Sequence, residues 1–169
     1  MSTEVQAPPK IAERQIDEVT ARYVRAADHR DGRAMAALFT DDAVVEIRYT
    51  GAGESELLGT VRGAEAIGHA VAGMMAPHPP LGWSHHTTFN HLVEVDGETA
   101  TNDAQFVVYN VVGRARPAEG WPPDASGAQG SITPIESGYV RSRLSRVDGR
   151  WLITELVISH DLPYAFPQD

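Results

Sequence analysis

Residues 83–95, W-S-H-H-T-T-F-N-H-L-V-E-V, predict a long β-strand, because β-branched and aromatic residues recur through an uninterrupted run. Asp96-Gly97 follows directly and is typical of a tight hairpin turn. Residues 99–112 then return as the partner strand. The same pattern recurs further along the chain, in two more strands around a turn signal: residues 132–146, Asp148-Gly149 and residues 151–160. This half of the chain therefore predicts four long strands in hairpins.

The first half of the chain is mainly helical in its periodicity. Apolar residues recur at helical spacing in three segments: residues 9–28, 33–39 and 63–75. Two short strands are predicted between them, at residues 43–49 and 57–61. Helices followed by a run of strands indicate an α+β fold. A strongly bent, mainly antiparallel sheet folded around three helices would enclose a cavity.

The sequence predicts a single domain. Its 169 residues and 18.3 kDa are enough for one hydrophobic core. We expect the domain to cover residues 9–162, with a disordered tail at residues 1–8 and a second tail at 163–169. Residues 114–131 form a long loop rich in Gly and Pro. Trp121 in this loop is expected either as a lid anchor over a ligand or, alternatively, as a dimer contact or part of a disordered segment.

Composition narrows the classes of function. Fourteen basic and 23 acidic residues give a net charge of −9, which argues against nucleic acid or an anionic membrane as partner. The chain has no Cys, no metal-binding His pair on a helix and no nucleotide-binding glycine loop. We therefore expect no metal and no cofactor. No apolar stretch approaches ~20 residues and no signal-peptide pattern opens the chain, so we expect a cytoplasmic protein.

Several stretches together resemble the SnoaL-like branch of the nuclear transport factor 2-like superfamily, which also contains scytalone dehydratase-like and bile acid dehydratase-like enzymes. These stretches are R-Y-V-R-A-A-D-H-R-D (22–31), A-L-F-T-D-D-A-V-V-E (37–46), V-R-G-A-E-A-I (61–67), H-H-T-T-F-N-H-L-V-E-V-D-G-E-T-A (85–100) and R-V-D-G-R-W-L-I (146–153). The resemblance implies a cone-shaped curved sheet around three helices, a pocket at its wide end, and a homodimer or higher homo-oligomer. The fold serves dehydratases, isomerases, cyclases, epoxide hydrolases and non-catalytic subunits, so the site must decide the function.

Asp28 and Tyr23, near the end of the first helix, are the first candidate site residues. Dehydratases of the resembled family have an Asp and a Tyr at these places, so Asp28 is expected to orient a histidine and Tyr23 to donate a proton or hydrogen bond to substrate. The alternative for Asp28 is a helix cap, although Asp31 is the better candidate for that role. The alternative for Tyr23 is a core aromatic residue.

His86 is the expected general base, because the family often has a His followed four residues later by an Asn, here Asn90. His85 should point to the opposite face, since strand side chains alternate, so only one of the two histidines is expected in the pocket. A second His that the scytalone dehydratase-like pattern has near Ala104 is absent. Asn90 or Asn102 would then stabilise an enolate oxygen.

Further residues are expected to bind substrate: Tyr49 as a second hydroxyl, and Trp83, Phe39, Phe106 and Met35 as apolar lining. For most of these apolar residues, ordinary core packing is the competing interpretation. The leading hypothesis is a cofactor-independent lyase or isomerase, dehydratase- or cyclase-like, that acts on a small hydrophobic oxygenated molecule. The alternatives are a non-catalytic binding or accessory subunit, and an epoxide hydrolase in which Arg141 or Arg143 would join an acidic pair.

Overall fold

The computed structural model describes residues 9–51, 53–163 and 165, and contains three helices and six strands in this part of the chain. The helices are α1 (Pro9–His29), α2 (Gly32–Ala36) and α3 (Ala64–Gly73). The strands are β1 (Phe39–Tyr49), β2 (Glu56–Arg62), β3 (Gly82–Asp96), β4 (Thr99–Gly113), β5 (Gly130–Val147) and β6 (Arg150–His160). The predicted α+β class is confirmed. The expected tail at residues 1–8 and most of the one at 163–169 lie outside the described residues.

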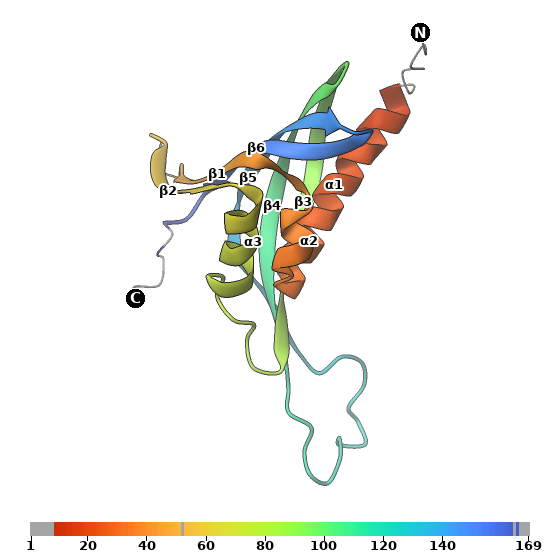
Figure 1. Ribbon diagram of the computed structural model, residues 1–169. Helices are drawn as coiled ribbons and strands as arrows, with labels where there is room; N and C mark the ends of the chain where they lie inside the picture. Colours follow the sequence, from red (N-terminus) through yellow and green to blue (C-terminus); the bar gives the residue numbers. More distant parts are fainter. Residues whose placement is uncertain (1–8, 52, 164, 166–169) are drawn as a thin grey trace.

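The strands form one mixed sheet in the order β2-β1-β6-β5-β4-β3. Neighbouring strands are antiparallel except for β1 and β6, which run parallel. The hairpin turns at Gly97 and at Asp148-Gly149 have positive φ angles of 58°, 50° and 77°, as tight turns of this kind require. Strands β3, β4 and β5 are long, and the sheet curves strongly as it crosses the molecule (Figure 1).

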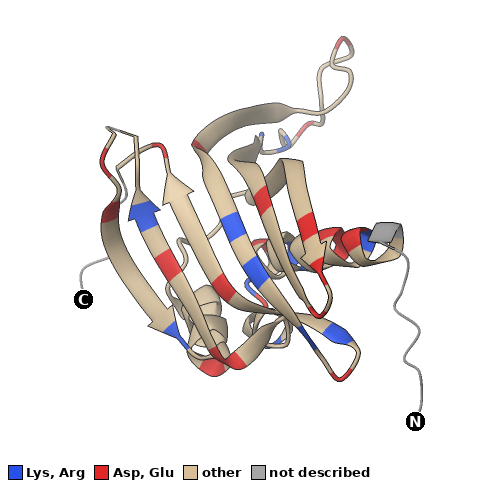
Figure 2. Ribbon diagram, turned by 90° about the horizontal axis from the view of Figure 1, so that it is seen from above, with Lys and Arg blue, Asp and Glu red and all other residues tan. Residues whose placement is uncertain are grey.

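The helices cover one face of this sheet, as the expected cone requires (Figure 1). The core between the layers contains Ile16 and Met35 from the helices and Leu144 and Ile153 from the sheet, all at most 2% exposed. Helices α2 and α3 touch through Gly32 and Gly68, where a Cβ atom on either glycine would clash with the backbone carbonyl of the other. Figure 2 looks onto the sheet with the helices behind it, and acidic and basic residues are distributed along the strands.

The second helix is shorter than the prediction of residues 33–39, and β1 starts earlier than the predicted residue 43. Phe39 belongs to the sheet because β1 runs beside β6, with Phe39 paired to Ile153. The Ile153 N–H donates to the Leu38 carbonyl over 2.8 Å. Tertiary strand pairing thus ends a helix that local periodicity would have continued.

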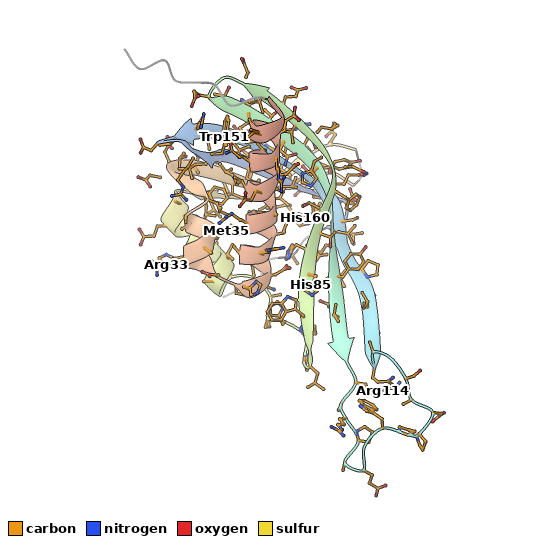
Figure 3. The ribbon with its side chains drawn as sticks, turned by 90° about the vertical axis from the view of Figure 1, so that its right-hand side faces the viewer. Arg33, Met35, His85, Arg114, Trp151 and His160 are labelled. Carbon is orange, nitrogen blue, oxygen red and sulfur yellow. The ribbon has the colours of Figure 1, made fainter. Side chains whose placement is uncertain are left out.

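The loop at residues 114–129 projects away from the helices and from the rest of the sheet (Figures 1 and 3). Arg114, labelled in Figure 3, marks the start of this projection. The loop that carries Trp121 points away from the body of the domain and covers neither the helices nor the sheet in this structure. Among the described helices, none is long and apolar enough to cross a membrane.

Candidate functional site

Asp28 lies at the C-terminal end of α1, just before the chain leaves the helix. Arg30 adopts a positive φ of 54°, and the Asp31 N–H donates to the Ala26 carbonyl over 3.0 Å, so the helix closes in a left-handed cap. Asp31 is the N-cap of α2, as predicted, and its side chain accepts a hydrogen bond from the Ala34 N–H over 2.9 Å. Asp28 is therefore available for other contacts, and it is only 6% exposed.

The Asp28 carboxylate binds the strand segment at His85 and His86. Its Oδ1 accepts from the His86 N–H over 2.8 Å and lies 2.7 Å from His86 Nδ1. Its Oδ2 lies 3.2 Å from His85 Nδ1. A carboxylate only accepts hydrogen bonds, so both Nδ1 atoms carry the proton and both Nε2 atoms of neutral rings are left as possible bases.

Both histidines contact the Asp28 carboxylate, although the exposure of their side chains alternates along β3 as expected. Strand β3 is an edge strand of the sheet, and the His86 N–H on its open side donates to Asp28. A carboxylate seated at a strand edge is accessible to side chains from both faces of the sheet. The two rings still differ in environment, because the His86 side chain is 19% exposed and the His85 side chain 54%. His86 is the better enclosed base.

The environment of Asp28 keeps it ionised. Burial alone would raise its pKa, but the hydrogen bonds from the His86 side chain, the His86 backbone and the His85 side chain outweigh burial. The pKa of Asp28 is therefore lowered below its ordinary value of 3.8. An ionised Asp28 can hold the imidazole orientation and stabilise the imidazolium that forms when a base takes up a proton.

A second ring contact holds the end of α1 against β3. His78 Nε2 lies 2.8 Å from the Asp28 carbonyl oxygen, and His78 Nδ1 accepts from the Ser84 N–H over 3.0 Å. The His78 ring stacks on Trp83, with centroids 4.2 Å apart and planes 15° apart. Trp83, which we expected to bind substrate, is instead packed against His78 and His29 at this joint.

Tyr23 is partly buried against the core and separate from the Asp28 carboxylate. Within the described residues its hydroxyl makes no hydrogen bond to Asp28 or His86, and its ring contacts Phe39 edge-on at 6.5 Å. Burial raises the pKa of Tyr23 to about 12. Tyr23 lines a small cavity of about 10 Å³, roughly the space of one water molecule, beside Thr20 and Asn102. The three expected catalytic residues are thus brought together only in part.

The expected substrate-binding residues are spread over the fold. Asn102 is 2% exposed and its Nδ2 donates to Thr20 Oγ1 over 2.9 Å, while Met35 and Phe39 are fully packed in the core. Asn90 is exposed, with φ +54° at a register shift in β3, and its side chain donates to Gln105. Its expected place on the side of His86 is wrong, because this bulge interrupts the alternation of the strand.

A cavity of about 290 Å³ lies among the described residues, at the ends of β5 and β6. Glu136 and His160 are its titratable lining residues, and Glu136 Oε2 lies 3.7 Å from His160 Nδ1. The remaining lining residues are Ile135, Ser137, Leu162, Pro163 and Ala165. Figure 3 labels His160 on the side of the sheet that faces α1. Phe106 contacts the His160 ring edge-on at 5.5 Å, and Tyr49 on β1 is the register partner of His160.

Glu136 and His160 were not among the predicted site residues. Glu136 shares the inward phase of Val140 and Leu144 on β5, so alternation within that strand would have identified it. The face on which His160 lies could not be predicted, because the pairing of β5 with β6 has a register shift between Arg143 and Leu144. Simple alternation from Trp151 places His160 on the outer face, whereas the shifted strand turns it inward and leaves it 7% exposed.

The arginines expected for an epoxide hydrolase lie on the outer face of the sheet. The Arg141 and Arg143 side chains are each 67% exposed, and Arg141 pairs with Asp103. Neither one reaches the cavity or Asp28. The expectation that one of them joins an acidic pair in the pocket is wrong, because both occupy the outward phase of β5.

Comparisons with known proteins agree with this fold. A family model described as SnoaL-like domain matches residues 11–157. A variant of Rv3472, a function-unknown protein from Mycobacterium tuberculosis, is similar in structure at 24% identity and a TM-score of 0.61, over 89% of this chain and 72% of that one. The same holds for ActVI-ORFA from Streptomyces coelicolor, at 17% identity, a TM-score of 0.61 and coverage of 88% and 96%.

A third similar structure is the β subunit of a putative aromatic-ring-hydroxylating dioxygenase from Novosphingobium aromaticivorans, at 15% identity, a TM-score of 0.65 and 92% coverage of each chain. A search of curated protein sequences found no match. At these identities the structural likenesses establish the fold alone. Because the family model covers most of the sequence, the chain belongs to the family of SnoaL-like domains.

Proposed function

We propose that this protein is a cofactor-independent acid–base enzyme, a lyase or isomerase that acts on a small hydrophobic ketone. The observation that carries the proposal is the buried Asp28 carboxylate, whose Oδ1 holds both the backbone and the ring of His86. In this arrangement His86 Nε2 is the general base that takes a proton from the carbon beside the carbonyl. Asp28 fixes the ring and stabilises its protonated form. We assign Tyr23 no reacting role, because it faces the smaller cavity.

We take the cavity of about 290 Å³ as the substrate site because Glu136, one of its lining residues, lies in the same sheet row as His86, through Val108. The volume of this cavity then limits the size of the substrate. About 290 Å³ is at the lower end of the volumes that ligand pockets have, so a molecule of one or two rings fits better than a larger one. Apolar walls from Ile135, Leu162 and Pro163 favour a hydrocarbon ring, while the polar groups favour oxygen substituents on it.

Proton abstraction is tested directly by hydrogen exchange. Cyclohexanone and 1-tetralone are incubated with the protein in D₂O, and deuterium at the carbon beside the carbonyl is followed by NMR. We expect the wild type to catalyse exchange, and His86→Gln to reduce the rate by about 10²–10⁴-fold, the usual contribution of a general base. His85→Gln is the matched control, since it removes the more exposed ring from the same carboxylate, and it should change the rate less than tenfold.

A binding or accessory role is the competing function, and one observation favours it. Tyr23, the expected hydrogen-bond donor, is not bonded to Asp28 or His86 within the described residues. If 1-tetralone perturbs the NMR signals of the His86 and His160 rings but the wild type catalyses no exchange with either ketone, the accessory role replaces the enzymatic one.

A further inference from the structure

Glu136 and His160 form a second polar pair on the inner face of the sheet, apart from Asp28. Glu136 Oε2 and His160 Nδ1 are 3.7 Å apart, and the two side chains are 28% and 9% exposed. Both line the cavity of about 290 Å³. Neither residue is required to build the core, because apolar residues fill the same inward phase further along β5 and β6, such as Leu144 and Ile153.

The strand register places this pair opposite His86. His86 on β3 is paired with Val108 on β4, and Val108 is paired with Glu136 on β5. Directly paired residues point to the same face of a sheet, so the three side chains form one row across three strands. With ~4.8 Å between neighbouring strands, the backbones of His86 and Glu136 are about 10 Å apart. Val108, which is small and 2% exposed, lies between them in this row.

Gly138 has no side chain and so leaves room for the Phe106 ring beside this row. It lies between Phe106 and His160 in the next row of the sheet, paired with both. A Cβ atom here would lie 2.9 Å from the Phe106 ring and would clash with the Ser159 carbonyl. The Phe106 ring can therefore lie over Gly138, which is two residues after Glu136 on β5, and against the His160 ring.

The protonation of the pair is compatible with acid catalysis. Burial raises the pKa of Glu136, although His86 and Arg30 nearby partly offset the effect. Burial also lowers the pKa of His160. Both shifts favour the neutral forms of the two groups, and the protonated form of the Glu136 carboxyl group can donate a proton.

We propose that Glu136 is the general acid of this site, and that it protonates the departing hydroxyl group of a β-hydroxy ketone of one or two rings while His86 works at the neighbouring carbon. The assignment rests on the proposed acid–base function. His86 Nε2 takes the proton from the carbon between the carbonyl and the hydroxyl-bearing carbon. The electron pair of that C–H bond forms the new C=C bond, the C–O bond breaks, and the hydroxyl leaves as water with the proton of Glu136. The proton on His86 then returns through solvent to the Glu136 carboxylate, which leaves an enone and water as the products.

The test separates the two halves of the reaction with three probes. Exchange of cyclohexanone in D₂O reports His86 alone. Elimination from 3-hydroxycyclohexanone, followed by the absorbance of cyclohexenone, requires both groups. Elimination from 3-acetoxycyclohexanone requires only His86, because acetate leaves without being protonated.

The variant Glu136→Gln keeps the shape of the side chain but cannot supply the proton. We expect its elimination of water to fall by about 10²–10⁴-fold, and its exchange rate and its elimination of acetate to fall much less. Glu94→Gln, an exposed change on β3, is the matched control and should leave all three rates unchanged. Removing a carboxyl group whose pKa burial raises does not weaken the fold near neutral pH, so thermal unfolding should confirm that the variant is folded.

Three results would overturn the assignment. Elimination of water by Glu136→Gln at the wild-type rate shows that another group supplies the proton. An equal loss on all three probes shows that Glu136 shapes the site and does not act as an acid. A wild type that neither exchanges nor eliminates with any probe refutes the proposed function itself, and the role of Glu136 falls with it.

Discussion

Replacing Asp28 by Asn tests whether a charged carboxylate holds α1 to β3. Asparagine has the same shape and keeps one acceptor oxygen at the Oδ1 position. That oxygen can still accept from the His86 N–H and ring, which are 2.8 and 2.7 Å away in the wild type. The change therefore removes the charge and turns the Oδ2 position, which faces His85, into a donor.

The expected cost follows from these contacts. A hydrogen bond to a charged group contributes about 1.5–3 kcal/mol and a neutral one about 0.5–1.5 kcal/mol, so each of the two His86 bonds weakens by about 1–1.5 kcal/mol. The His85 side chain is 54% exposed, so its contact adds little. We expect Asp28→Asn to lose about 2–3 kcal/mol of unfolding free energy at pH 7.

Urea unfolding, followed by Trp fluorescence, measures this difference. Asp31→Asn is the matched control, because it makes the same chemical change three residues away. Asp31 is an exposed N-cap and Asn caps a helix as well as Asp does, so its unfolding free energy should stay within ~0.5 kcal/mol of the wild type. Long-range ¹H–¹⁵N NMR should also find the His86 ring protonated at Nδ1 in the wild type, and a larger share of the Nε2-protonated form in Asp28→Asn.

Acid should remove the difference between wild type and Asp28→Asn. The pKa of Asp28 is lower in the folded chain than its ordinary value of 3.8. The carboxylate therefore stabilises the fold fully above pH ~4, and this contribution is lost as the pH falls through the lower, folded pKa. An Asp28→Asn variant that matches Asp31→Asn in stability at pH 7, or a stability difference that does not shrink in acid, would refute this account of the site.

Three further predictions concern the surroundings of the site. Because burial raises the pKa of Tyr23 to about 12, one of the five tyrosines should titrate late in an absorbance titration, Tyr23→Phe should lack this phase, and the wild type should lose stability as the pH rises from about 10 to 12. Gly68→Ala should cost about 1–3 kcal/mol in chemical unfolding, because its Cβ would clash with the Gly32 carbonyl, whereas Gly73→Ala in the same helix meets no atom within 4 Å and should be neutral or stabilising. His78→Ala removes the ring bonded to Asp28 and Ser84 and stacked on Trp83, so it should lower stability by about 1–3 kcal/mol and change Trp fluorescence, with exposed His69→Ala as its control.

Local signals in the sequence were sufficient to predict most of the fold. Asp96-Gly97 and Asp148-Gly149 predicted both hairpins, and the long strand runs predicted β3, β4, β5 and β6 to within about two residues. The parallel pairing of β1 with β6 left no local trace, because it joins residues more than 100 positions apart. That pairing also determined where the second helix ends.

The part of the candidate site that follows a sequence motif was predictable. The part that depends on strand edges and register shifts was not. The resemblance to known dehydratases selected Asp28 and His86, and the structure brings these two together. His85 joined them because Asp28 binds a strand edge, which alternation within a strand cannot anticipate. The outward position of Asn90 and the inward position of His160 have one cause: a single extra residue in a strand reverses the face of the residues beyond it.

The order of the strands has a consequence for how this chain acquires its structure. Strands β1 and β2 join the rest of the sheet only through β6, which is the last strand in sequence. Until residues 150–160 are in place, the first hairpin has an unpaired edge and the sheet exists as two separate pieces. Contacts between such distant segments are slow to form, so we expect slow folding and a partly folded species that exposes the edge of β1. Changes in β6 that leave the native contacts of Asp28 untouched should therefore reduce the yield of folded protein by promoting aggregation during folding.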